Sequence, residues 1–162
     1  MAAGFFRPSS IVPVSSLCGI AVHSAGSTGV TQRFAMYIPD ATTLNADQTF
    51  AIEFPFPPTL PSGQLKMRLR SYANAATGVV KFNPKWFSLA AGENPGDATL
   101  AAEGTQTITW ATGNENDMLV TEVTLDADTP VAEEVLIMNL VFEDTNTTLA
   151  VASYHIIEFF WE

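Results

Sequence analysis

The residue types that could support catalysis are few in this sequence and lie far apart. The candidates for a nucleophile–base pair are two histidines, His23 and His155, and one cysteine, Cys18. Such a pair needs a Ser, Thr or Cys beside a base that a third group orients. His155 alternates with apolar neighbours, which favours a histidine on a sheet or at an interface. We therefore expect no enzyme activity, and two distant histidines predict no zinc site.

The seventeen acidic residues could include an acid–base pair or a calcium site. Asp126 and Asp128 flank a turn, but a calcium loop needs more oxygen ligands at alternate spacing and a glycine at its sharp turn. Here Pro130 follows instead. A glycosidase pair depends on three-dimensional geometry, so that alternative stays open. No residue pattern predicts a metal or a cofactor.

Three tryptophans, Trp86, Trp110 and Trp161, could form a platform on which sugar rings stack. Each lies in a strand-like segment among Phe and Leu residues, where tryptophan usually packs in the interior. We expect all three in the core or at a subunit interface.

The charges are segregated along the chain. Fourteen acidic residues lie within 86–162, a stretch that has no Lys or Arg. Five of the seven basic residues come just before it: Lys66, Arg68, Arg70, Lys81 and Lys85. The first three share one face of a strand with a two-residue period, and the last two could extend this row if the next strand pairs beside it. We expect two opposite electrostatic faces, with the row as a partner-binding surface for the acidic part of the same chain or of another copy.

The bulk composition excludes several classes of partner. A net charge of −10 opposes binding to nucleic acid, whose phosphates repel an acidic protein. No apolar stretch is long enough to cross a bilayer, so we expect no membrane partner. A single cysteine excludes an internal disulfide framework.

The pattern of apolar residues predicts short strands rather than helices. Strands are expected at 33–38, 48–54, 64–72, 79–82, 86–89, 105–111, 118–125 and 148–161. The segment 133–142 follows a residue pattern loosely similar to a helix cap, but its continuous apolar run between strands favours a strand buried on both faces. The fold class expected is all-β: an antiparallel β-sandwich, jelly-roll-like, with an extended N-terminal arm.

The first 32 residues differ in composition from the rest, since they are rich in Gly, Ser, Ala and Pro. We therefore divide the chain into an N-terminal arm, 1–32, and a sandwich domain, 33–162. The aromatic pair Phe5 and Phe6, followed by Arg7, either belongs to a frayed terminus or becomes ordered on a neighbouring subunit. Both interpretations remain open.

The stretch 63–82, GQLKMRLRSYANAATGVVKF, resembles a recurring pattern in small β-sandwich virion proteins of tailed bacteriophages. Its most specific part is 69–78, and the resemblance covers about 33–162. It implies a non-enzymatic capsid decoration or cement protein that stabilises the phage head shell. The implied partners are the major capsid protein and further copies of the chain, with a homotrimer expected. The implied location is the outer surface of the virion, after synthesis in the bacterial host cytoplasm.

In this interpretation the candidate partner-binding residues are Phe5, Phe6, Arg7, Lys66, Arg68 and Arg70. The alternative is a β-sandwich module of a phage tail fibre or baseplate that binds a host glycan. A small carbohydrate-active enzyme with a carboxylate pair is the least favoured hypothesis.

Overall fold

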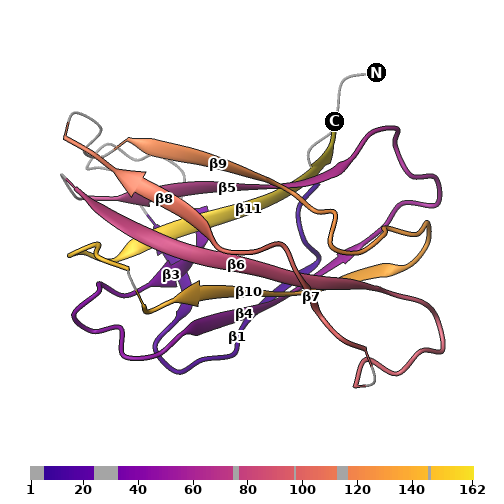
Figure 1. Ribbon diagram of the computed structural model, residues 1–162, viewed down its shortest axis with the longest axis horizontal. Coiled ribbons are helices and arrows are strands. Elements are labelled where there is room, and N and C mark those ends of the chain that lie inside the picture. The colour runs from indigo at the N-terminus through magenta and orange to yellow at the C-terminus, as the bar shows by residue number, and fades with distance from the viewer. Residues whose placement is uncertain (1–5, 24–32, 75–76, 97, 113–116, 146) are drawn as a thin grey trace.

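The computed structural model describes residues 6–162 apart from 24–32, 75–76, 97, 113–116 and 146. Two antiparallel sheets pack face to face, and no helix occurs among the described residues. Figure 1 shows the two layers, with β9, β5 and β11 in one and β8, β6, β10 and β4 in the other.

The strands have the following bounds: β1 Ser10–Pro13, β2 Gly19–His23, β3 Arg33–Ile38, β4 Gln48–Pro55, β5 Leu65–Ala73, β6 Gly78–Leu89, β7 Ala101–Ala102, β8 Gln106–Trp110, β9 Met118–Thr124, β10 Val135–Glu143 and β11 Ser153–Trp161. The first sheet has the order β1-β4-β10-β6-β7, and β8 pairs with β6 beside β7. The second sheet has the order β2-β3-β11-β5-β9.

Eight of these strands follow jelly-roll topology. These eight are β3 to β6 and β8 to β11. The second sheet contains β3, β5, β9 and β11, and the first contains β4, β6, β8 and β10. The resulting orders, β3-β11-β5-β9 and β4-β10-β6-β8, are those of two interleaved Greek keys. The prediction of an antiparallel, jelly-roll-like β-sandwich is confirmed.

The two-residue period of the strands builds the core. In β5 every odd residue from Leu65 to Ala73 is buried, while the even residues are only partly covered. β10 shows the same alternation. The segment expected at 133–142 is a strand from Val135 to Glu143, and only one of its faces is fully buried. The three tryptophans are at most 4% exposed, which confirms that they pack inside the protein.

The described part of the N-terminal segment lies along one side of the sandwich. β1 pairs with β4 of the first sheet, and β2 pairs with β3 of the second. Before β1, Phe6 and Phe159 exchange two backbone hydrogen bonds of 2.8 Å. The boundary between an arm and a sandwich at 32/33 stays a prediction, but residues 10–13 and 19–23 contribute an edge strand to each sheet.

Candidate functional site

The outer face of the second sheet carries a row of three tyrosines, which are all the tyrosines of the chain. Tyr154 of β11 pairs in register with Tyr37 of β3 on one side and with Tyr72 of β5 on the other. Their neighbours along each strand are buried, so the alternation of a strand points the three tyrosines away from the core. We call these three residues the tyrosine row.

The side chains of the tyrosine row remain partly exposed, and two of the rings lie close together. The centroids of Tyr37 and Tyr154 are 5.6 Å apart, with their planes tilted by 58°. On the far side of Tyr72, Met118 of the edge strand β9 continues the row in register and is 44% exposed. Three adjacent, hydrogen-bonded strands therefore hold the aromatic side chains at fixed separations.

Beside the tyrosine row, the same face carries Lys66, Arg68 and Arg70, which we call the basic row, together with their acidic partners. Arg70 Nε donates to Glu158 Oε2 at 3.0 Å, and Lys66 Nζ lies 2.7 Å from Glu162 Oε2. Arg68 Nε donates to Glu122 Oε1 at 2.7 Å. The guanidinium of Arg68 also lies 4.8 Å from the centroid of the Phe160 ring, in cation–π geometry.

The expectation of two opposite electrostatic faces is wrong for this sheet. β5, which carries Lys66, Arg68 and Arg70, lies between β9 and β11, which belong to the acidic half of the sequence. Antiparallel pairing therefore places cations and carboxylates on one face, where each cation of the row meets a glutamate of the same chain. The row therefore has partners among the chain's own acidic residues. That Lys66, Arg68 and Arg70 also contact another protein stays a prediction.

Lys81 and Lys85 do not extend the basic row. They lie on β6, which belongs to the first sheet, and their register partners on β10 are Glu143 and Asn139. The chain crosses from one sheet to the other after Ala73, so the hairpin pairing that would have placed these lysines beside Arg70 does not form.

Two further predicted partner-binding residues, Phe6 and Arg7, lie near the C-terminal half of β11. Phe6 packs edge-on against Trp161, with centroids 5.5 Å apart, and lies 6.0 Å from the Phe54 ring. Arg7 is exposed. Phe5 lies outside the described residues. Whether any of these residues contacts another protein stays a prediction.

Among the described residues considered for catalysis, His155 is not exposed to solvent. His155 is fully buried, with Nδ1 2.8 Å from Ser71 Oγ and Nε2 2.9 Å from Ser153 Oγ. Burial lowers the pKa of His155 to about 3, because the charged imidazole would lose its hydration. Ser71 is buried as well, which closes this serine–histidine contact to solvent. His23 ends β2, and its side chain is outside the described part of the structure.

Within the described residues, no group of three or more His, Cys, Asp or Glu side chains could hold a metal ion. Asp128 instead accepts a hydrogen bond of 2.9 Å from the backbone N–H of Ser88. The same part of the chain contains no helix that is long and apolar enough to cross a membrane.

The tyrosine row was missed by sequence reasoning, because its members lie 35 or more residues apart in the chain. Each tyrosine does occupy the outward position of a strand with a two-residue period, which is the one signal that the sequence offers. Only the strand order β3-β11-β5 and its register bring the three together.

No protein family and no curated protein matches the sequence. Solved structures do match. One of them comes from a study of the promiscuous specificity of carbohydrate-binding modules from the β-sandwich superfamily. It matches at 8% identity and a TM-score of 0.52, over 100% of this chain and 58% of that chain. An arabinose-bound α-L-arabinofuranosidase, MgGH51, matches at 11% identity and a TM-score of 0.50, over 94% of this chain and 23% of its own.

A third structure is the carbohydrate-binding module TmCBM61 in complex with β-1,4-galactotriose, at 13% identity and a TM-score of 0.44, over 96% of this chain and 91% of that one. At these identities, the matches at a TM-score of 0.50 or above show a shared β-sandwich fold and nothing more. The bacteriophage-specific part of the resemblance found in the sequence has no support among these matches.

Proposed function

We propose that this chain is a non-catalytic binding module that binds a neutral glycan on the tyrosine row. The observation that carries the proposal is the placement of all three tyrosines on adjacent strands of one outer face. This corresponds to the glycan-binding alternative predicted from the sequence, although through tyrosines and not through tryptophans.

The geometry of the row suits the flat apolar faces of sugar rings. Neighbouring strands are about 4.8 Å apart, so aromatic side chains on β3, β11 and β5 offer a line of contacts across the strands. Each tyrosine combines an apolar ring with a hydroxyl that can bond a sugar hydroxyl. A rigid sheet also loses little conformational entropy on binding.

The charges beside the row favour a neutral ligand. Arg70 and Arg68 could donate to sugar hydroxyls from beside the row, but Glu158 and Glu122 already balance their charges. An anionic glycan would have to compete with these glutamates for the guanidinium groups. A neutral glycan needs only the apolar ring contacts and a few hydrogen bonds.

The fold likeness is consistent with the proposal. A carbohydrate-binding module is among the β-sandwich structures similar to this chain at a TM-score above 0.5. A fold alone hosts many functions, so the argument depends on the tyrosine row and not on the likeness.

The test is a glycan array followed by affinity measurements with the best neutral oligosaccharide. Tyr154→Ala, at the centre of the row, should weaken binding at least about ten-fold, as truncation of a central aromatic contact typically does. Tyr154→Phe keeps the ring and should retain most of the affinity.

Lys85→Met, on the outer face of the other sheet, is the control and should leave affinity unchanged. Thermal unfolding of each variant separates lost binding from lost folding. If Tyr154→Ala and the unaltered protein bind the oligosaccharide with equal affinity, the proposal is wrong.

A second candidate function is the capsid decoration predicted from the sequence, and exposed apolar side chains on β9 favour it. Met118 and Val120 are 44% and 50% exposed on an edge strand, where another subunit could cover them. In this hypothesis the chain forms a homo-oligomer on the outer virion surface and binds the major capsid protein. Val120→Lys should then reduce the size of the oligomer measured by sedimentation velocity and reduce cosedimentation with empty capsids. If the variant keeps the oligomer size and the capsid binding of the unaltered protein, the capsid-decoration hypothesis is wrong.

A further inference from the structure

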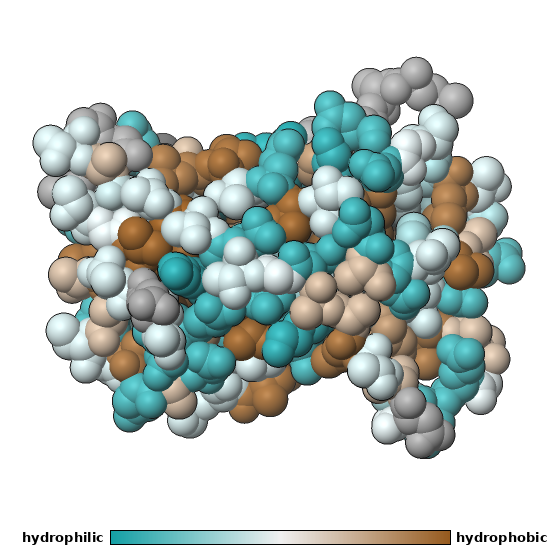
Figure 2. Space-filling model, viewed as in Figure 1, coloured by the Kyte–Doolittle hydropathy of each residue, from teal (hydrophilic) through white to brown (hydrophobic). Residues whose placement is uncertain are grey.

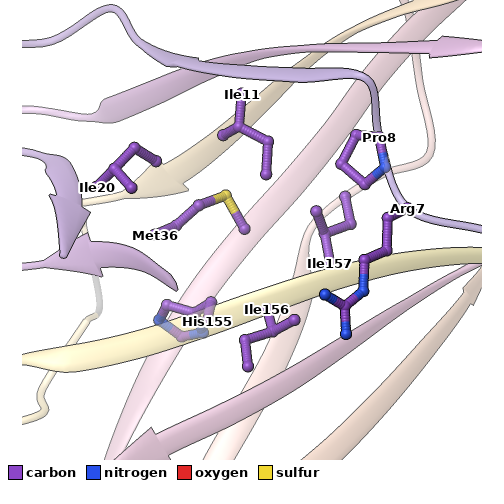
Figure 3. Close-up of a pocket in the computed structure, with 8 residues that line it drawn as sticks. All are labelled: Arg7, Pro8, Ile11, Ile20, Met36, His155, Ile156 and Ile157. Carbon is purple, nitrogen blue, oxygen red and sulfur yellow. The ribbon is translucent and has the colours of Figure 1, made fainter. Parts of the chain in front are cut away.

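A pocket lies at the side of the sandwich, beneath the N-terminal segment. Its volume is about 220 Å³. Figure 3 shows side chains from four parts of the chain around it. The lining residues are Arg7, Pro8, Ile11, Ile20, Met36, His155, Ile156 and Ile157.

The pocket exists because the pairing along β11 is interrupted on one edge. β3 pairs with β11 only from Ser153 to His155, and the next pairing on this edge is between Phe6 and Phe159. Ile157 lies between the two. From Phe6 the chain then crosses to the other sheet, where the N–H of Ser9 donates to the carbonyl of Glu53 at 2.8 Å. The crossing residues, Arg7 and Pro8, form the outer wall of the pocket.

The interruption leaves backbone polar groups directed at the pocket. Phe159 uses its N–H and its C=O to bond Phe6. In an antiparallel strand, residues two apart direct these groups to the same side, so Ile157 directs its N–H and C=O to the same edge. No described residue pairs with Ile157 on that edge.

The pocket joins apolar walls to one cation. Pro8, Ile11, Ile20, Met36 and Ile157 supply carbon atoms. Arg7 supplies a guanidinium that makes no ion pair or hydrogen bond with another described residue, and it extends toward β11 in Figure 3. His155 is neutral, and both of its ring nitrogens are engaged by serines. Arg7 therefore supplies the one net charge among the lining residues.

We propose that this pocket binds a small amphipathic anion, namely a carboxylate that carries a short apolar chain. The chain would fill the space between Ile11, Ile20 and Met36, and the carboxylate would accept hydrogen bonds from Arg7 and from the N–H of Ile157. Arginine is well suited to this role because its planar group matches a carboxylate in two parallel hydrogen bonds.

Size and charge restrict the ligand further. An apolar cavity of roughly 150 Å³ holds benzene, so this pocket takes an apolar group somewhat larger than that. The net charge of −10 repels an anion at long range, but about 0.15 M salt screens charges beyond roughly 8 Å. Attraction must therefore come from Arg7 at contact distance. The site is separate from the tyrosine row, which lies on the outer face of the sheet.

The test is calorimetric titration of the full chain with octanoate, at 0.15 M salt and below the concentration at which octanoate forms micelles. Octan-1-ol and octylammonium are the matched neutral and cationic probes. We expect octanoate to bind, octan-1-ol to bind at least about ten-fold more weakly and octylammonium more weakly still, as expected when a hydrogen bond to a charged group is lost.

Two variants locate the site. Arg7→Met keeps the apolar stem and should weaken octanoate binding about ten-fold or more, while Lys85→Met makes the same charge change on the far sheet and should have no effect. Ile20→Trp should fill the pocket from its exposed edge and abolish binding, with thermal unfolding as the check on its fold. Absence of octanoate binding, equal affinity for octylammonium, or an unaltered affinity in Arg7→Met would overturn the proposal.

Discussion

Phe6 shows how a single residue of the N-terminal segment is bound to the sandwich. Its ring is partly buried against Trp161 and Phe54, and its backbone pairs with Phe159. The sequence left open that the aromatic pair Phe5 and Phe6 becomes ordered on a neighbouring subunit. In the structure, Phe6 already has contacts within its own chain. A role in binding another subunit would have to coexist with these contacts.

Phe6→Ala should lower the free energy of unfolding by about 1–3 kcal/mol. The range lies below that of a fully buried phenylalanine because the Phe6 ring is only partly covered. Urea denaturation measures the change. Val14→Ala, at a side chain 64% exposed, is the control and should change the same quantity by less than about 0.5 kcal/mol. Equal effects of the two substitutions would show that the Phe6 contacts do not stabilise the fold.

Because His155 is buried in its neutral form, the protein should lose stability in acid. Its pKa is about 3 in the folded protein and close to the ordinary 6.5 in the unfolded chain, so the unfolded state binds the extra proton between these values. This contribution to stability is intact above about pH 6.5 and declines as the pH falls toward 3. The groups that face the ring are Ser71, Ser153 and Phe142, and Arg7 lines the same pocket.

The measurement compares urea denaturation of the unaltered protein and His155→Gln at pH 7 and pH 5. Other titrating groups are common to both proteins, so the difference isolates the histidine. From pH 7 to pH 5, the unaltered protein should lose about 2 kcal/mol more than the variant. Parallel pH dependence in the two proteins would mean that His155 can be protonated in the folded state.

At the level of the strands, the C-terminal end of β11 closes tightly against the loop before β5. Gln64 and Glu162 exchange backbone hydrogen bonds of 2.8 and 3.1 Å. Gly63 stands beside them with a φ of +106°, and a Cβ at this position would lie 2.6 Å from the carbonyl carbon of Glu162. This approach requires a glycine for its backbone conformation and for its lack of a side chain.

Gly63→Ala should therefore destabilise the protein by more than about 1 kcal/mol, since the conformational strain and the steric clash act together. Gly92→Ala is a matched control, because Gly92 has a φ of +90° and open space around its missing Cβ. Gly92→Ala introduces the conformational strain without the steric clash. Thermal unfolding should therefore show a smaller loss of stability for Gly92→Ala than for Gly63→Ala. If Gly92→Ala proves equally harmful, the contact with Glu162 contributes nothing.

The strands themselves were largely predictable from the sequence. The segment 64–72 has a strict two-residue period, and β5 occupies Leu65–Ala73. The segments on either side of Pro84 form one strand, β6, and not two. Pro84 falls between the part of β6 that pairs with β8 and the part that pairs with β7, where a missing N–H costs least. β7, with two residues, lies between the strands expected at 86–89 and 105–111 and was not predicted.

The pairing of strands was not predictable, and this is why the candidate site was missed. The sequence places the basic row and the acidic half in separate blocks, and only the order β11-β5-β9 interleaves them. The tyrosine row likewise depends on register between strands far apart in sequence. Alternation along a strand reveals which side chains point outward, but it carries no information about which strand lies next to it.

For the molecule as a whole, β11 separates two surfaces of different character. Its outward residues include Tyr154 and Glu158, on the face proposed to bind a glycan, while His155 and Ile157 point inward and line the pocket. On the face seen in Figure 2, hydrophilic and hydrophobic residues are interspersed. The described part of the jelly roll therefore carries an aromatic face, proposed to bind a glycan, and a side pocket, proposed to bind a small carboxylate.

The most direct test of the central claim uses the fact that the chain has three tyrosines. With ring-labelled tyrosine, an NMR spectrum reports on the tyrosine row and on nothing else, since Tyr37, Tyr72 and Tyr154 are its members. Titration with the best neutral oligosaccharide from an array should shift the signals of all three rings together, with one dissociation constant. A glycan that binds while the three signals stay in place, or an array without any neutral glycan bound, would contradict the account.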